Sequence, residues 1–287
     1  MGSGIDLESL PLLARGGQAD IYGYESGKVL RVPRRVQDHD RIRYEREVYS
    51  FLADCGIAAP KVYGIIDVGG APAIVMERLH GASMMERIGK RPFSIWKVPK
   101  ELAGMHLDLL RHGAGPSFMD AKEKARHCIL QSGRIDAALK ERLLEVLQRL
   151  PEGDRLCHGD FHPGNIICQD GRNRIIDWSS ASRGDPASDV AHTFLLMRVV
   201  PRVPSMGPLM HRIQKRLARS MAEAYRRTMF EALRIPACLF SRWVLIAAAE
   251  RTFYGLPSEQ GPLRSFIGKY MGALDRGGSE DDLHRLI

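Results

Sequence analysis

Short stretches of alternating apolar and polar residues fill the first part of the chain, and this pattern predicts strands. The stretches cover residues 10–14, 20–24, 28–32, 60–67 and 73–77. Small turn-forming residues separate them: Ser26-Gly27 and Gly69-Gly70 are typical of tight hairpins. The chain therefore begins with a small β-rich region.

A helical pattern interrupts these strands at residues 38–55. Its apolar residues, for example Ile42, Val48 and Leu52, fall near the spacing that places side chains on one helix face. Gly56 follows directly and suits a C-cap, so we expect the helix to end there.

Most of the remaining chain has the periodicity of helices, over residues 94–150 and 208–280. In the second block, Ile213, Leu217 and Met221 share one expected apolar face. Strands followed by helices predict an α+β protein in which a larger helical region follows the β-rich one.

One β-like segment lies between the two helical blocks. Residues 166–168 and 174–176 are apolar or alternating, and Asp170 and Gly171 lie between them. Asp-Gly between two such runs is a strong hairpin signal, so we predict a hairpin embedded in the helical part.

Composition places the 287-residue chain among ordinary globular proteins, with 44% hydrophobic and 26% charged residues. No apolar run approaches the roughly 18 residues of a membrane span, and the N-terminus has no signal-peptide pattern. Five widely spaced cysteines without a CxxC motif favour a reduced, cytoplasmic protein. The net charge of +8 favours anionic partners such as nucleotides, although a solvated basic surface also explains it.

Three oxygen-bearing side chains between residues 156 and 189 suggest a chemistry: Asp160, Asn165 and Asp177. Phosphoryl transfer needs an acceptor hydroxyl held in line, a group that takes its proton, and metal that neutralises phosphate charge. A loop carboxylate suits the first task, whereas an amide oxygen and a second carboxylate suit magnesium. We expect the hairpin to return Asp177 beside Asn165, so that all three groups converge on one magnesium-bound triphosphate.

The motif HGDFHPGN, followed by IIDW, resembles the catalytic signature of aminoglycoside phosphotransferases and choline kinases, distant relatives of protein kinases. The resemblance implies a protein-kinase-like bilobal fold, with an N-lobe at residues 1–79 and a C-lobe at residues 80–287. It also implies transfer of the γ-phosphate of ATP (or GTP) to the hydroxyl of a small molecule, with Mg²⁺ as cofactor.

The same resemblance assigns roles to single residues of this segment. It makes Asp160 the catalytic base, and Asn165 and Asp177 the ligands of magnesium. His158 is implied to buttress the catalytic loop, and Asp189 to support that loop from the C-lobe.

Further nucleotide-binding residues are implied in the N-lobe, where Gly16 and Gly17 occupy the place of a loop that covers the nucleotide. Arg31 stands where kinases carry a phosphate-pairing lysine, and arginine is not equivalent to lysine. Lys28 is the alternative cation, although strand alternation would point it to the opposite face.

An acid on the following helix should pair with this cation, and both Glu45 and Glu47 are present. We favour Glu45, because its distance from the following leucine matches the family. Met76, Glu77 and Leu79 resemble the hinge strand whose backbone would bind the adenine.

Three other functions compete with this interpretation. His158, Asp160 and His162 form H-x-D-x-H, which a zinc- or iron-dependent hydrolase would use. Arg31 in place of lysine invites a catalytically weak or inactive nucleotide-binding protein on a kinase fold. The basic helix expected at residues 208–233 suggests a nucleic-acid binder, but no recognised nucleic-acid motif accompanies it.

The fold and motif do not fix the acceptor. Aminoglycosides and choline are cationic, and pockets for them need acids. The C-terminal helices contain such acids alongside many arginines: Glu223, Glu231, Glu250 and Glu259. From the basic balance we expect a neutral or anionic metabolite, sugar or nucleoside-like acceptor, with Trp243, Phe253 and Tyr254 as aromatic candidates for its pocket. The choice between ATP and GTP and the oligomeric state stay open.

Overall fold

The computed structural model describes residues 5–35, 39–90, 95–199 and 207–287. Asp38 and Ser94, the expected first residues of two helical stretches, lie outside them. The chain groups into two compact units: an N-terminal unit, Met1–Arg87 with Pro163–Ala181, and a helical unit, Ile88–His162 with Ser182–Ile287. The predicted lobe boundary between residues 79 and 80 stays a prediction.

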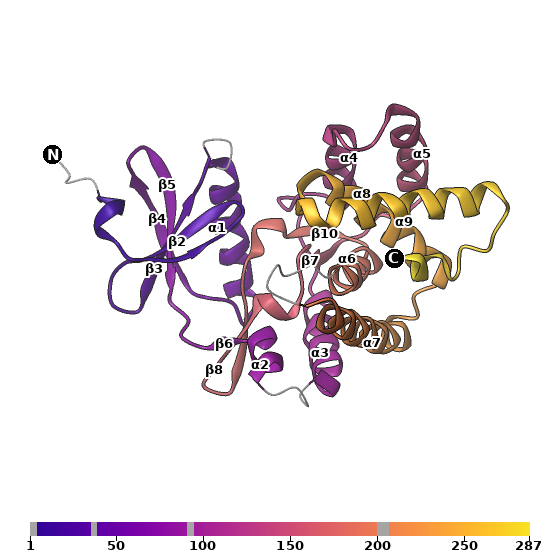
Figure 1. Ribbon diagram of the computed structural model, residues 1–287. Helices are drawn as coiled ribbons and strands as arrows, with labels where there is room; N and C mark the ends of the chain where they lie inside the picture. The colour runs from indigo at the N-terminus through magenta and orange to yellow at the C-terminus, as the bar shows by residue number, and fades with distance from the viewer. Residues whose placement is uncertain (1–4, 36–38, 91–94, 200–206) are drawn as a thin grey trace. The chain divides into compact units, whose positions relative to one another are not determined.

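A five-stranded antiparallel sheet, in the order β1-β2-β3-β5-β4, forms the body of the N-terminal unit (Figure 1). Its strands are β1 Leu12–Arg15, β2 Ala19–Gly23, β3 Lys28–Pro33, β4 Val62–Val68 and β5 Ala71–Glu77. The hairpin glycines have positive φ, 71° at Gly27, 61° at Gly69 and 85° at Gly70, which glycine adopts without steric cost. The predicted strands and their turns are confirmed.

Helix α1, His39–Asp54, contacts β4 and β5, and Figure 1 shows it alongside the strands. Its predicted apolar residues Ile42, Val48 and Leu52 are buried. Gly56 has φ 69°, and the Ile57 N–H reaches back to the Leu52 carbonyl at 2.9 Å, which confirms the predicted C-cap.

A second, three-stranded sheet completes the N-terminal unit in the order β6-β8-β9. Its strands are β6 Ala82–Ser83, β8 Ile166–Gln169 and β9 Arg172–Ile175. Strands β8 and β9 form the predicted hairpin, with Asp170 at φ 51° and Gly171 at φ 74° in the turn. The short helix α2, Met84–Lys90, was not predicted and begins with a reciprocal Ser83–Glu86 capping box.

The helical unit is built from seven described α-helices and a two-stranded ladder. The helices are α3 Val98–Leu110, α4 Ala121–Gln131, α5 Ala137–Gln148, α6 Pro186–Arg198, α7 Pro208–Leu233, α8 Ala237–Tyr254 and α9 Pro257–Asp275. The ladder pairs β7 Arg155–Cys157 with β10 Ser182–Gly184. Short 3₁₀ turns occur at Leu7–Ser9, Pro163–Asn165, Trp178–Ser180 and Leu283–Leu286 across the two units.

Helix α8 forms the centre of this unit and packs against α4, α5, α6 and α9. Its run from Val244 to Ala249 is fully buried, since a helix that is apolar on all sides must be covered on all sides. Helix α6 was not predicted, because buried polar residues such as Asp189, His192 and Thr193 obscure its apolar periodicity.

Helix α7 departs from its expected burial. Met221 is buried as predicted, but Ile213 is 42% and Leu217 is 37% exposed. The first turns of the helix therefore leave apolar side chains exposed that periodicity alone would have placed in the core.

Two findings bear on the expected compartment. Among the described helices, none combines the length and apolarity required to cross a membrane. The five cysteines, all within the described residues, form no disulfide. Cytoplasmic localisation itself stays a prediction.

Candidate active site

The β8–β9 hairpin determines where Asn165 and Asp177 lie within the N-terminal unit. Ile166 is in register with Ile175, and the Ile176 N–H donates to the Asn165 carbonyl at 2.9 Å. Asn165 is thus held across from the strand end that leads directly into Asp177. The hairpin register therefore brings Asp177 back beside Asn165, as expected.

Asp177 itself has an uncommon backbone conformation, with φ 61° and ψ 65°. Aspartate tolerates this left-handed region better than most residues, and such positions concentrate at functional sites. Its Oδ1 atom accepts hydrogen bonds from Ser179 Oγ at 3.0 Å and from Arg31 Nη2 at 3.1 Å. The side chain is 39% exposed, so the carboxylate is partly accessible to a ligand.

Arg31 joins two carboxylates on neighbouring elements of the same unit. Its Nε lies 2.8 Å from Glu45 Oε2, and its Nη2 contacts Asp177. Burial opposes the guanidinium charge, but the carboxylates of Glu45 and Asp177 outweigh it and raise the pKa of Arg31. Glu47 is exposed, so the structure pairs Arg31 with the acid favoured from the sequence.

Lys28, the alternative cation, is on the other face of β3. Its Nζ binds Glu25 at 2.6 Å and lies 4.9 Å from the ring centroid of Tyr63. Within the described part of the unit, Arg31 and not Lys28 therefore contacts Asp177.

The HGD loop in the helical unit is organised around Asp189. The backbone N–H groups of His158 and Gly159 donate to its carboxylate at 2.6 and 2.8 Å, and His106 Nε2 lies 3.0 Å away. Gly159 has φ 76°, a conformation that suits glycine and turns both N–H groups toward Asp189. His106 also contacts the Tyr225 hydroxyl at 2.6 Å and is fully buried, so it supports Asp189 from within the helical unit.

Asp160 follows this loop, and its backbone N–H donates to His158 Nδ1 at 3.2 Å. Burial alone would raise the pKa of Asp160, but His162, together with His158 and Arg251, outweighs this effect and lowers it. His162 Nε2 lies 3.6 Å from the carboxylate, which is about one-third exposed at 32%. Asp160 is therefore an ionised, accessible carboxylate at neutral pH.

Gly16 and Gly17 form the tight connection between β1 and β2, where the Gly16 N–H donates to the Ala19 carbonyl at 3.0 Å. A Cβ atom at Gly16 would lie only 2.5 Å from that carbonyl oxygen, whereas one at Gly17 would meet open space. Gly16 is therefore required by the turn, and the loop as a whole is exposed.

The predicted hinge residues follow one another at the end of β5. Met76 is buried in the sheet, and Glu77 contacts Arg174 Nη2 and the Lys61 N–H through Oε2 at 2.6 and 2.9 Å. The N–H of Glu77 donates to Lys61, and that of Arg78 to Gly27. Among the described contacts none involves the N–H of Leu79, which makes this backbone group the best suited to a ligand.

Comparison with known proteins decides the family. The sequence matches the family described as "Phosphotransferase enzyme family" over residues 20–230, which is most of the chain. The chain belongs to this phosphotransferase family. A search among curated proteins finds no significant match.

Solved aminoglycoside phosphotransferases share the fold. The ternary complex of a thermostable APH(4)-Ia mutant with AMP-PNP and hygromycin B has a TM-score of 0.61 at 18% identity, covering 97% of this chain and 93% of that one. The streptomycin–ATP complex of APH(2")-IIa has a TM-score of 0.55 at 18% identity, with coverages of 90% and 89%. The type VIII aminoglycoside-3'-phosphotransferase has a TM-score of 0.58 at 19% identity, with coverages of 86% and 93%. The predicted protein-kinase-like α+β fold class is confirmed.

Two residues beside Asp160 in this phosphotransferase were not predicted as part of its site. His162 is visible in the motif, where it had been considered only as a metal ligand of a hydrolase. Arg251 contributes from the end of α8, and nothing in the sequence connects it with Asp160. Its guanidinium also binds Glu259 through Nε at 2.9 Å and Nη2 at 2.8 Å.

The hydrolase alternative gains no support from the geometry. The His158 ring is fully buried, and its Nδ1 accepts a backbone hydrogen bond. Over the described residues, no group of three or more His, Cys, Asp or Glu side chains is placed to hold a metal ion. The proposed magnesium ligands, Asn165 and Asp177, are one amide and one carboxylate, which form a different kind of site from a zinc or iron cluster.

Most acids of the C-terminal helices have cationic partners within the helical unit. Glu250 is 3.1 Å from both Lys124 Nζ and His192 Nε2. Glu259 binds Arg251, and Glu223 binds Arg226. Of the four acids noted in the sequence, Glu231 is the exposed one without an ion pair among the described residues.

The Glu250 pairs predict a pH dependence of stability. Burial alone would raise the pKa of Glu250, but Lys124 and His192 outweigh it and lower the pKa from 4.5 to about 2. Since the unfolded chain then binds more protons than the native one, stability is present above pH 4.5 and is lost as the pH falls toward 2. We expect Glu250→Gln to remove about 2 kcal/mol of acid-sensitive stability between pH 6 and pH 3, measured by urea unfolding across that range.

The matched control for this experiment is Glu231→Gln, which removes a carboxylate that is exposed on α7. It should retain the wild-type dependence of unfolding free energy on pH. An unchanged acid slope in Glu250→Gln would show that its ion pairs do not stabilise the fold.

Proposed function

We propose that this phosphotransferase is a magnesium-dependent kinase that moves the γ-phosphate of ATP or GTP to the hydroxyl of a small molecule. The observation that carries the proposal is the arrangement around Asp177: a left-handed aspartate, held by Arg31 and Ser179, beside Asn165 at the hairpin base. Asp160, an ionised carboxylate five residues before Asn165 in the chain, supplies the proton acceptor.

Nucleotide contacts are proposed along the sheet of the N-terminal unit. Gly16 and Gly17 would cover the phosphates with backbone, as the exposed, side-chain-free loop allows. Arg31, oriented by Glu45, would pair with phosphate oxygens, because its planar fork suits that geometry. The backbone of Met76, Glu77 and Leu79 would meet the adenine, with the Leu79 N–H as donor.

Magnesium fits the donor set of the hairpin base. Asn165 and Asp177 offer hard oxygen ligands, and magnesium keeps several waters and phosphate oxygens when only one or two protein ligands bind it. Both hydrogen bonds to Asp177 go to Oδ1, which leaves Oδ2 for the ion. When bound, the ion would neutralise charge on the β- and γ-phosphates.

Asp160 is proposed to orient the acceptor hydroxyl and to take its proton. The acceptor oxygen forms a bond to the γ-phosphorus, the bond to the β–γ bridging oxygen breaks, and the nucleoside diphosphate leaves. The lowered pKa keeps Asp160 deprotonated before transfer, as a proton acceptor requires. His158 is proposed to position Asp160 through the hydrogen bond to its backbone N–H.

A neutral or anionic acceptor is the proposed substrate class. Arg251 contributes positive potential at Asp160, and Glu250 and Glu259 are occupied by ion pairs. The structural neighbours include complexes with hygromycin B and with streptomycin, so a cationic aminoglycoside is the alternative acceptor. Phe253 and Tyr254 are 41% and 43% exposed and stay candidates for the acceptor pocket, whereas Trp243 is buried in the core.

A panel of hydroxyl compounds tests the function directly. Sugars, nucleosides, anionic metabolites, amino alcohols and aminoglycosides would be incubated with MgATP or MgGTP, and nucleoside diphosphate formation measured. We expect a neutral or anionic compound to accelerate it. Acceleration by aminoglycosides alone would overturn the proposed acceptor class, and no acceleration by any compound would favour the inactive nucleotide-binding alternative.

Asp177→Ala tests the metal site separately from turnover. We expect this variant to lose the magnesium dependence of AMP-PNP binding, with the dissociation constant in Mg²⁺ rising at least about tenfold, because a charged ligand is removed. Titration calorimetry with Mg²⁺ and with EDTA measures the difference. Glu47→Gln is the control, since Glu47 is exposed on α1; an undiminished magnesium effect in Asp177→Ala would contradict the assigned ligand.

A further inference from the structure

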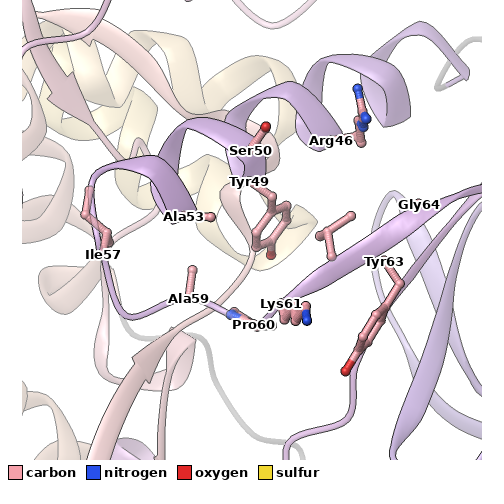
Figure 2. Close-up of a pocket in the computed structure, with 11 residues that line it drawn as sticks. Arg46, Tyr49, Ser50, Ala53, Ile57, Ala59, Pro60, Lys61, Tyr63 and Gly64 are labelled. Atoms are coloured by element: carbon pink, nitrogen blue, oxygen red, sulfur yellow. The ribbon is translucent and has the colours of Figure 1, made fainter.

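A cavity of about 310 Å³ lies between α1 and the chain leading into β4 (Figure 2). Its walls belong entirely to the N-terminal unit. None of the residues proposed for nucleotide, metal or proton transfer lines it. The volume is at the lower end of the range of small-molecule sites.

The inner wall of the cavity is apolar and fixed. The Tyr49 ring, only 3% exposed, faces the Pro60–Val62 strand entrance, and Ala53 and Ile57 continue the wall. The Tyr49 hydroxyl is held by a hydrogen bond from the Trp178 backbone. This wall of the cavity is therefore preformed, so the protein loses less conformational entropy when a ligand binds.

The rim of the cavity is cationic. Arg46 and Ser50 lie on α1, Lys61 and Tyr63 lie on the facing segment, and all four line the cavity. Lys61 Nζ lies 5.3 Å from the centroid of the Tyr63 ring. In the described chain no carboxylate forms an ion pair with either side-chain cation. The nearby Glu77 carboxylate instead binds Arg174 and the Lys61 backbone N–H.

An apolar, partly aromatic floor beneath two uncompensated cations defines a ligand class. We infer that this cavity binds a small amphipathic anion: an aromatic body that fills the space against Tyr49 and Ile57, with one carboxylate, sulfonate or phosphate group held by Arg46 and Lys61. A neutral compound of the same shape would leave both cations unpaired, and a small inorganic anion would leave the apolar wall uncovered. Both should bind more weakly.

A pair of fluorescent probes tests the site. 1-Anilinonaphthalene-8-sulfonate has the required aromatic body and anionic group, and N-phenyl-1-naphthylamine is the same body without the charge. We expect saturable binding of the sulfonate, at least about tenfold tighter than the neutral probe, which is the factor expected from one charge-assisted contact. Equal affinity of the two probes would overturn the inferred role of the cations.

Three variants locate the binding. The double variant Arg46→Gln, Lys61→Gln should weaken binding of the sulfonate probe at least about tenfold. It should leave the affinity for the neutral probe unchanged. Ala53→Trp, at an exposed lining position, should abolish saturable binding of both probes by filling the cavity. Arg43→Gln is the control, because Arg43 is on α1, 68% exposed and outside the lining.

Circular dichroism and thermal unfolding confirm that each variant is folded, which is expected because the changed side chains are exposed. Wild-type affinity in the filled or charge-depleted variants would place the probe elsewhere, for example on exposed apolar residues of α7, and would overturn the inference. Since no nucleotide takes part, this outcome is independent of the proposed kinase activity.

Discussion

Replacing Asp160 by asparagine is expected to lower the rate of phosphoryl transfer by about 10²- to 10⁴-fold, the usual contribution of a positioned proton acceptor. The amide keeps the shape of the side chain but cannot take the hydroxyl proton. Nucleotide affinity should change by less than about threefold, because the proposed nucleotide contacts lie on other residues. The measurement combines nucleoside diphosphate formation, with the best acceptor or with water, and calorimetric binding of AMP-PNP.

Asp154→Asn is the matched control for this variant, since the Asp154 side chain is 79% exposed and, among the described residues, its carboxylate forms an ion pair only with the neighbouring Arg155. It should keep the wild-type rate. A slow rate in Asp160→Asn that comes with an equal loss of nucleotide affinity would contradict the proposed role, because it would indicate a binding residue. A wild-type rate would exclude Asp160 as the base and would favour another proton acceptor.

Replacing Asp189 by alanine is expected to lower the free energy of unfolding by about 3–5 kcal/mol, the range for breaking a buried charged pair. The change leaves the His158 and Gly159 N–H groups without their acceptor and His106 without its carboxylate. Burial alone would raise the pKa of Asp189, but His106, His158 and the Gly159 N–H outweigh it and lower the pKa. Urea unfolding at pH 7 measures the loss.

Asp185→Ala provides the comparison on the same helix. Asp185 caps α6 by accepting the Ala187 N–H at 2.7 Å, and loss of such a cap costs about 1 kcal/mol. The Asp189 variant should therefore be several times more destabilised than the Asp185 variant. Equal, small losses in both would show that the HGD loop does not depend on Asp189.

The elements with strong local signals were predictable from the sequence. Gly56, Gly69-Gly70 and Asp170-Gly171 mark sharp ends and turns, because these residues adopt positive φ where others resist it. The Asn165–Asp177 proximity followed from the hairpin, since register brings the base of one strand beside the end of the other. Glu45 was separable from Glu47 by family spacing, and the structure pairs it with Arg31.

Other features depend on contacts that no local pattern carries. Helix α6 buries Asp189 and His192, so tertiary partners compensate polar residues that periodicity would place outside. Arg251 acts on Asp160 from a distant helix. The acids of the C-terminal helices looked available for a cationic acceptor, but the ion pairs of Glu250 and Glu259 with Lys124 and Arg251 became visible only in three dimensions.

The central claim is that Asn165, Asp177 and Asp160 serve one magnesium-bound nucleotide. An experimental structure of the chain with AMP-PNP and Mg²⁺ tests it most directly. We predict side-chain oxygens of Asn165 and Asp177 at about 2.1 Å from the ion, with Asp160 in hydrogen-bond reach of the site where an acceptor hydroxyl faces the γ-phosphate. A nucleotide bound with its metal on other ligands, or with Asp160 directed away from the γ-phosphate, would contradict the account.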